Sequence, residues 1–248
     1  METVENGTII HLPTGVKVTF DQMIDTISSS RVIYVGETHD NLEAHRAQLE
    51  IIQSLVERYP NQIAVGMEMF RKSAQKSLDI WTQGSFPNSE FKNLFLKNWG
   101  GDFRLYQKIF EYIQGQQIPL VALKSTEEEQ ARFKQNNGNF FSEPSLEIDE
   151  NDKYHKAYSM SIFGGHQNHV PGTYSPYRTL LFWEETMART VVDFLQNNER
   201  DGWKLIVLAG GFHVQYGFGI PKRAFRRFPH AYSIVLPTVT EIPPELEN

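Results

Sequence analysis

The chain contains no cysteine, no long apolar run and no strongly basic segment, and each absence argues against one class of function or site. Without cysteine it has no disulfides, no thiolate metal ligands, no thiol nucleophile and no thiolate-ligated haem. No stretch approaches the ~20 apolar residues needed to span a bilayer, and the N-terminus shows no signal-peptide hydrophobic region. The formal charge of −6 argues against a nucleic-acid partner. We interpret the one short basic stretch, Arg223, Arg226 and Arg227, as a solvated helix face.

What the chain does have is four short apolar runs, each followed by charged or ionisable residues. The runs are residues 31–35, 63–67, 119–123 and 205–209, and helical patterns separate them. Short continuous runs rich in valine and isoleucine are typical of parallel strands buried on both faces. Because parallel strands point the same way, the residues that follow them meet at one sheet edge. Ligands of open α/β folds bind at that edge.

The fold class that these patterns predict is α/β, a three-layer sandwich around a mostly parallel sheet. We expect a single domain over residues 1–248, since the length fits one large α/β unit. The further elements expected are an N-terminal β-hairpin over residues 8–20, helices over 41–59 and 176–197, and a last strand over 232–236.

Residues 127–176 differ in character from the rest of the chain. They contain a polar stretch, an acidic stretch and then a cluster of histidines and aromatic residues. The segment is longer than a usual crossover between strands. We therefore expect a helical lid, inserted within the domain and lying over the strand ends.

The residues that follow the apolar runs form the candidate site. They are Glu37, His39, Glu68 and His213. The helix predicted to start directly after His39 presents free N–H groups, which favour a nearby anion. Glu68 lies between two methionines, so its carboxylate requires a partner, either a cation such as Lys124 or a metal ion.

The helix predicted over residues 176–197 adds another carboxylate. Glu184 falls on its apolar stripe and is expected to face inward, where it would need a partner such as a strand-edge histidine. Glu185 is expected on a different face of the same helix. His45 lies on the apolar face of the helix at 41–59, and we interpret it as a hydrogen-bonded core histidine.

Three chemistries fit this set of residues. His39, Glu68 and His213 could hold a divalent metal that activates water. Without a metal, a histidine polarised by a glutamate could act as a general base toward an ester or amide. Alternatively, the edge could bind a cofactor and perform no reaction. The chain has no nucleophile elbow, Walker A loop or dinucleotide-binding glycine motif to decide between them.

Read together, several segments resemble the ChaN-like haem-binding family of bacterial iron uptake, whose members are usually lipoproteins. The resemblance spans roughly residues 31–236 in the right order. Its motifs are GETHDN at 36–41 followed by His45 and Gln48, GMEMF at 66–70, Trp99-Gly100, WEETMA at 183–188, and AGGFHV at 209–214 with GIP at 219–221.

The resemblance implies haem bound beneath a helical lid, across a homodimer, with a tyrosinate as the expected iron ligand. The cofactor-binding residues that we carry over as candidates are Tyr154, Tyr158, His166, Tyr174, Arg178 and Glu184. Among the tyrosines we favour Tyr158, which follows Tyr154 by one helical turn. The resemblance also implies a location in the cell envelope, with any membrane attachment through a lipid anchor outside this sequence.

The wider superfamily implies a second function. It is similar also to erythromycin esterases and to Tiki-type metal-dependent proteases, in which the positions matching Glu37, His39, Glu68 and His213 are catalytic or metal-binding. The alternative to haem binding is therefore a hydrolase of ester or peptide bonds that uses these four residues.

Overall fold

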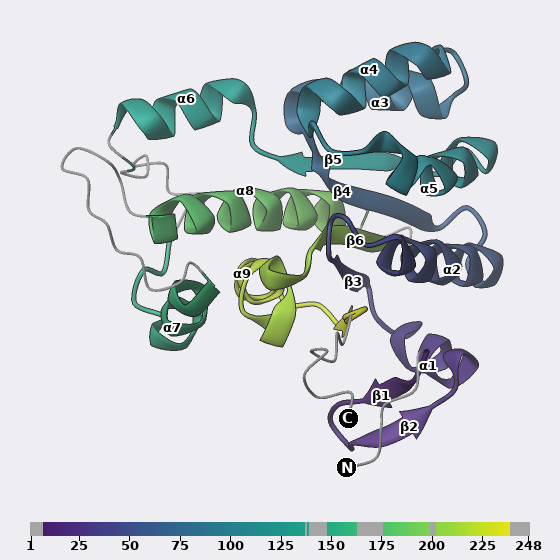
Figure 1. Cartoon of the computed structure of the whole chain (residues 1–248), viewed down its shortest axis with the longest axis horizontal. Helices are drawn as coiled ribbons and strands as arrows, with labels where there is room; N and C mark the ends of the chain where they lie inside the picture. Colours follow the sequence, from purple (N-terminus) through teal and green to yellow (C-terminus); the bar gives the residue numbers. More distant parts are fainter. Residues whose placement is uncertain (1–6, 137, 139–147, 163–175, 199–201, 239–248) are drawn as a thin grey trace, which may run out of the picture.

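A five-stranded parallel sheet, in the order β5-β4-β6-β3-β7, forms the centre of the computed structural model (Figure 1). The structure describes residues 7–136, 138, 148–162, 176–198 and 202–238. The strands of the sheet are β3 (Val32–Glu37), β4 (Ile63–Arg71), β5 (Leu120–Lys124), β6 (Lys204–Gly210) and β7 (Tyr232–Val235). The expected parallel α/β sheet is confirmed.

The register of the sheet brings the carboxyl ends of its strands together. β3 and β6 pair from Val32 opposite Leu205 to Glu37 opposite Gly210. β4 runs past the predicted end of its strand at residue 67 and shifts register against β5 before Arg71. Glu68 therefore lies within β4, just beyond its last paired residue with β6, rather than in a loop after the strand.

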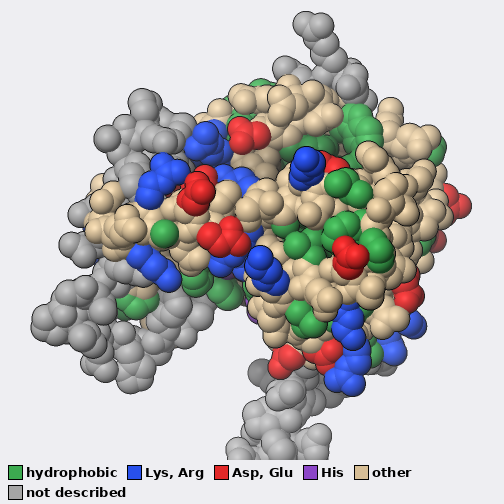
Figure 2. All heavy atoms as spheres, turned by 90° about the horizontal axis from the view of Figure 1, so that it is seen from above, with side chains coloured by type: hydrophobic (Ala, Val, Ile, Leu, Met, Phe, Trp, Pro, Cys, Tyr) green, Lys and Arg blue, Asp and Glu red, His purple; other side chains and the backbone are tan. Residues whose placement is uncertain are grey.

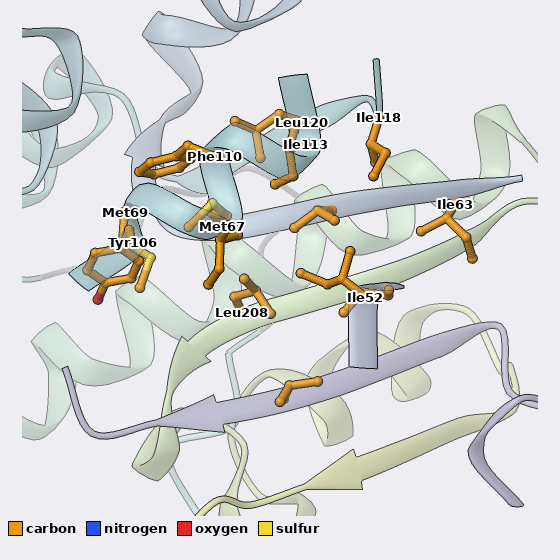
Figure 3. Packing of buried hydrophobic residues seen from close by; sticks show 14 of the residues in the cluster. Ile52, Ile63, Met67, Met69, Tyr106, Phe110, Ile113, Ile118, Leu120 and Leu208 are labelled. Atoms are coloured by element: carbon orange, nitrogen blue, oxygen red, sulfur yellow. The ribbon is translucent and has the colours of Figure 1, made fainter. Parts of the chain in front are cut away.

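Alternate residues of the strands face two separate cores, which makes the molecule three-layered. Ile33 and Val35 of β3 face a core built with α2 (Leu42–Arg58), α3 (Gln75–Thr82), α4 (Asn88–Asn98) and α5 (Phe103–Gly115), shown in Figure 3. Val32 and Tyr34 face the core built with α8 (Pro176–Asn197) and α9 (Ile220–Arg227). Continuous apolar strands are what such double burial requires.

The N-terminal hairpin is also confirmed. β1 (Ile9–His11) pairs antiparallel with β2 (Val16–Val18) in a sheet of its own. α1 (Phe20–Ile27) follows, and its first turn is closed by a capping box in which Thr19 and Gln22 satisfy each other's backbone N–H groups. Among the described residues, no helix is both long and apolar enough to cross a membrane.

The segment expected to form a lid is described only in part. α6 (Glu127–Gln135) begins with a capping box between Thr126 and Glu129. α7 (Lys153–Ile162) lies near one end of α8 (Figure 1). Because residues 139–147 and 163–175 lie outside the described residues, closure over a ligand stays a prediction.

The central sheet predicts the cost of emptying its core. Ile206 is fully buried between β4 and β3 and packs into the α2–α5 core. Ile206→Ala should lower the free energy of unfolding by about 3 kcal/mol, because it leaves a cavity. Leu12→Ala, at a hairpin position that is 79% exposed, should change it by less than about 0.5 kcal/mol. Urea denaturation measures both, and equal effects would contradict this packing.

Candidate functional site

Polar side chains from both faces of the sheet meet at its carboxyl edge. One group surrounds Glu37 at the end of β3, and we call it the Glu37 cluster: Glu37, His39, His45, Gln48 and Tyr106. A second group extends from Glu68 of β4 toward α8 and α9, and we call it the Glu184 cluster: Glu68, His155, Glu184, Glu185, His213 and Arg223. The four residues predicted from the sequence all lie in these two clusters.

In the Glu37 cluster both carboxylate oxygens have partners. Glu37 Oε1 accepts from the Tyr106 hydroxyl at 2.5 Å and lies 2.7 Å from His39 Nδ1. Glu37 Oε2 accepts from Gln48 Nε2 at 2.9 Å. Asn41 caps α2 and so starts the helix that carries Gln48 onto this carboxylate. Because an ionised carboxylate only accepts, His39 Nδ1 donates to it.

The partners of Glu37 decide its charge. Burial alone would raise the pKa of Glu37, but the hydrogen bonds from His39 and Tyr106 and the nearby imidazole of His45 outweigh it and lower that pKa to about 2. Burial would lower the pKa of His39, but the carboxylates of Glu37 and Glu68 raise it. The pair is thus a fixed anion holding a half-buried imidazole that favours its protonated form.

His45 occupies the position expected of a core histidine. Its side chain is 2% exposed, its ring packs edge-on against Tyr106 at 4.3 Å, and Nε2 lies 3.5 Å from Glu37 Oε2. Neither ring nitrogen makes an aligned hydrogen bond within the described part of the chain. The expected burial of His45 is therefore present. In place of the expected hydrogen bond, its ring lies near the Glu37 carboxylate and packs against the Tyr106 ring.

Gly210 is the point where the two clusters touch. Its backbone N–H donates to Glu68 Oε2 at 2.8 Å. A Cβ at this position would lie only 3.0 Å from His39 Nε2 and 3.6 Å from Glu68 Oε2. The absence of a side chain therefore lets His39 and Glu68 approach the same stretch of backbone.

Glu68 connects the contact at Gly210 to the other members of the Glu184 cluster. Glu68 Oε1 lies 3.4 Å from His213 Nε2, and His213 Nδ1 lies 3.3 Å from Glu184 Oε1. The partner of Glu68 is thus His213 rather than Lys124, whose ammonium lies over the Trp99 ring at 4.5 Å. His213 belongs to the 3-10 turn η2 (Gly211–His213) that directly follows β6.

His213 and its two carboxylates fix one another's charge. Burial would lower the pKa of His213, but the flanking carboxylates of Glu68 and Glu184 raise it to about 9. Burial would raise the pKa of Glu68, but His213, the Gly210 N–H and His39 bring it down to about 2. Burial likewise opposes the ionisation of Glu184, and His155, His213 and Arg223 lower its pKa below the usual value.

One expectation about α9 is wrong, and α8 buries a second carboxylate beside the expected one. Glu185 has partners partly different from those of Glu184, in keeping with its expected place on another face, and both are fully buried. Arg223 was expected on a solvated face, yet it is 1% exposed and its Nε lies 3.3 Å from Glu184 Oε2 and 3.7 Å from Glu185 Oε1. The reason is tertiary: α9 packs along the flank of α8 that carries Glu185, and Arg226 and Arg227 pair with that carboxylate as well.

The expected cofactor-binding residues are spread over different environments. Tyr154 is 66% exposed, and the Tyr158 hydroxyl donates to Gln215 Oε1 at 2.7 Å. Arg178 pairs with Glu150 at 2.6 Å, and Glu184 is the buried centre described above. His166 and Tyr174 lie outside the described residues.

An aromatic group beside Tyr158 was not singled out from the sequence. Tyr216 is 69% exposed, has the left-handed φ of 56° that is rare for a tyrosine, and packs edge-on against Tyr158 at 5.3 Å. The centre of the Phe218 ring lies 6.0 Å from that of Tyr216 and 6.1 Å from that of Tyr158. The only signal in the sequence is the alternation of aromatic residues and glycines at residues 216–219.

The described residues contain no group of three or more histidine, aspartate and glutamate side chains arranged to hold a metal ion. The set proposed for a metal, His39, Glu68 and His213, is instead joined by ion pairs and by the approach to Gly210. Each member already has a partner of opposite charge.

Comparison with known proteins finds one matching family and several structures of similar fold. Residues 23–224 match the family described as haem-binding uptake, Tiki superfamily, ChaN. The structure described as cofacial haem binding to ChaN of Campylobacter jejuni is similar, with a TM-score of 0.74 and 18% identity over 98% of this chain and 95% of that one. A mutant of the erythromycin esterase EreC in its open conformation has a TM-score of 0.56 and 16% identity over 92% and 76% of the two chains. At these identities the structures show a shared fold. No curated protein sequence matches the chain.

The charge of His213 predicts how stability depends on pH. Its raised pKa means that the folded protein keeps a proton that the unfolded chain loses, so the stabilisation is complete at low pH and is lost as pH rises. Between about 6.5 and about 9 the free energy of unfolding should fall by up to ~1.4 kcal/mol per pH unit. His213→Gln should remove this part of the slope, whereas His11→Gln, in the N-terminal hairpin, should keep it. Denaturation at several pH values checks this, and a slope unchanged in His213→Gln would refute it.

Proposed function

Because the chain belongs to the haem-binding uptake, Tiki-superfamily ChaN family, we propose that it binds haem. The observation that carries the proposal is the match of this family to most of the chain. Support comes from the shared fold of Campylobacter jejuni ChaN, which is described as binding haem cofacially. Enclosure by residues 127–176 and pairing of two copies around the haem belong to the same proposal.

We place the haem against α7 and the turn that follows β6. Tyr158 of α7 meets Gln215 and Tyr216 of the 3-10 turn η3 (Gln215–Gly217). The exposed ring of Tyr216 and the half-buried ring of Phe218 would offer flat apolar surface to a porphyrin.

The donor chemistry of this place fits haem. Its candidate ligands are phenols, and tyrosinate is one of the side chains by which proteins hold haem iron. Burial, Tyr216 and Glu184 raise the pKa of Tyr158, so without haem the hydroxyl stays protonated and donates to Gln215. When bound, ferric haem would supply the positive charge that stabilises the phenolate. Gln215 would hold the phenol in place until then.

Haemin titration tests this placement. The wild-type protein should shift the Soret band saturably at micromolar haemin, and Tyr158→Phe should weaken the affinity about tenfold or more because it removes the oxygen donor. Tyr112→Phe serves as the matched control, since Tyr112 packs on the other face of the sheet, and it should leave the affinity unchanged. Tyr154→Phe separates the two tyrosines of α7.

Two outcomes of the titration would contradict parts of this proposal. A wild-type protein without a saturable shift would overturn haem binding itself. A normal titration for Tyr158→Phe together with a weakened one for Tyr154→Phe would keep haem binding and move the iron ligand to Tyr154.

The Glu37–His39 pair supports a second candidate function, hydrolysis of an ester or peptide bond. The fully buried Glu37 side chain holds Nδ1 of a His39 ring whose side chain is 38% exposed, which is the arrangement by which a carboxylate orients a general base. His39 Nε2 would be the atom that accepts a proton from water or substrate. Glu68 and His213 would act through the charge of the edge, as the contact at Gly210 places them nearby.

A screen of ester and peptide substrates tests this candidate. His39→Ala should abolish any activity found, and His11→Ala, which changes a histidine of the hairpin, should retain it. Because the pKa of His39 is raised, activity should rise with pH as the ring loses its proton. Equal rates for His39→Ala and the wild type on every substrate would rule this candidate out.

A further inference from the structure

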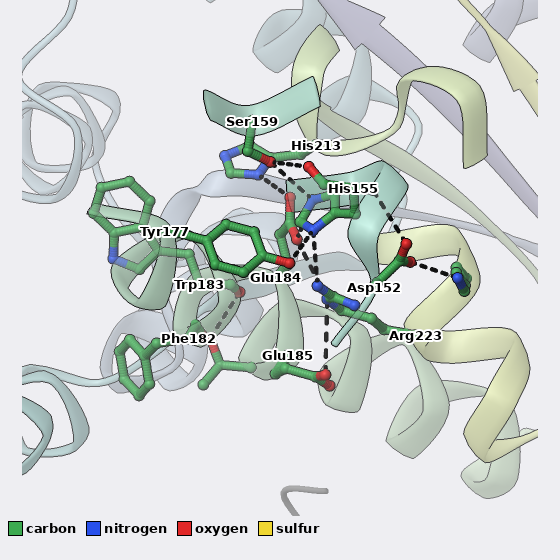
Figure 4. Close-up of polar contacts among 12 residues, drawn as sticks. Asp152, His155, Ser159, Tyr177, Phe182, Trp183, Glu184, Glu185, His213 and Arg223 are labelled. Atoms are coloured by element: carbon green, nitrogen blue, oxygen red, sulfur yellow. Dashed lines mark hydrogen bonds and ion pairs between the residues drawn. The ribbon is translucent and has the colours of Figure 1, made fainter. Parts of the chain in front are cut away.

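The most deeply buried contacts of α7 are polar. Among the side chains of residues 153–161, which the structure describes, the fully buried ones are His155 and Ser159, and the apolar ones are not members of either core. Amphipathic helices normally dock through an apolar stripe. In α7 a buried histidine faces the protein instead, and Figure 4 shows it among Ser159, Tyr177, Glu184 and Arg223.

The contacts of His155 define its protonation. His155 Nδ1 lies 3.3 Å from Arg223 Nη2 and 3.2 Å from the Tyr177 hydroxyl. A guanidinium only donates hydrogen bonds, so Nδ1 accepts and the ring proton is on Nε2. Nε2 lies 3.2 Å from Glu184 Oε2. The ring therefore lies between the cation of α9 and the anion of α8.

The carboxylate of Glu184 is shared between this histidine and the strand edge. Oε1 faces His213, whereas Oε2 faces His155 and Arg223. Gly219 closes over it: a Cβ there would lie 2.7 Å from Glu184 Oε1 and 2.1 Å from the carbonyl oxygen of His213. Any side chain at this position would collide with the carboxylate and with the backbone of His213, so glycine leaves the space that Glu184 occupies.

The position of His155 sets the position of Tyr158. The two residues lie on neighbouring turns of α7, and Tyr158 reaches Gln215, which lies two residues after His213. Both contacts thus attach α7 to segments that the Glu184 cluster holds. A ligand-binding side chain that is held in place before binding needs less ordering when the ligand arrives.

We propose that His155 is the positioning residue of the haem-binding tyrosine: through Glu184 and Arg223 it fixes α7 so that the Tyr158 hydroxyl faces the ligand. This inference rests on the proposed haem binding. It also gives Glu184 a role within that function, because the carboxylate orients His155 and does not touch the ligand.

A double-mutant cycle on haemin affinity tests the positioning role. His155→Phe keeps a ring but removes the polar contacts of the imidazole, and it should weaken haemin binding about tenfold. His155→Gln restores one acceptor and one donor, and it should recover most of that loss. Lys222→Gln is the matched control: it removes the ion pair between α9 and Asp152 beside the start of α7, and it should change the affinity less than about twofold.

The cycle separates positioning from general structural support. In the Tyr158→Phe background, His155→Phe should cost little more, because the side chain that it positions is already gone. Equal losses from His155→Phe in both backgrounds would overturn the proposal, since they would mean that His155 supports the fold without acting through Tyr158.

Hydrogen exchange tests the anchoring without haem. Amides of residues 153–162 should exchange faster in His155→Phe than in the wild type or in Lys222→Gln, because α7 has lost its buried contact. If haemin does not bind the wild-type protein, the proposed function fails while this measurement still reports on α7. Unchanged exchange in His155→Phe would refute the anchoring itself.

Discussion

The structure depends on burying four carboxylates, Glu37, Glu68, Glu184 and Glu185, along one edge of the sheet. Each would be costly to take out of water alone, and an unpaired buried charge would destabilise the fold by several kcal/mol. In the folded chain, buried carboxylates alternate in space with positively charged groups. Cations or strong hydrogen-bond donors lie beside every carboxylate. Breaking one pair would leave a charge uncompensated, so the cluster holds its members in a single arrangement.

This alternation explains why distant segments converge. Glu68 needs His213 from beyond β6, and Glu184 needs both His213 and Arg223. The helices α8 and α9 are consequently joined to each other by ion pairs as well as by apolar packing. On this face of the sheet, polar contacts decide the geometry. On the opposite face an aromatic core packs the helices α2, α3, α4 and α5 against the sheet, and the Glu37 cluster lies at its edge.

The sequence predicted the sheet because its strands are continuous apolar runs, a signal that depends only on local pattern. It also predicted that Glu37, His39, Glu68 and His213 gather, because parallel strands end at one edge. It could not predict Glu185 or Arg223, since a helical wheel shows which face is apolar and not which neighbour covers the other faces. The exposure of the Tyr216 ring could not be predicted for a similar reason, because the left-handed backbone of Tyr216 depends on the turn around it. The surface shown in Figure 2 carries acidic and basic side chains interspersed, so charge at the surface would not have indicated the buried network.

The two clusters divide the functional possibilities between the faces of the sheet. The Glu184 cluster supports α7 and lies near Tyr216 and Phe218, where we place haem, whereas the Glu37 cluster holds the half-buried imidazole suited to acid–base chemistry. The most direct test of the account is the absorption spectrum of wild-type and Tyr158→Phe protein purified in parallel from haem-replete cells. We predict a coloured wild-type protein with a Soret band and a variant that has lost most of it. A colourless wild-type protein would contradict the account.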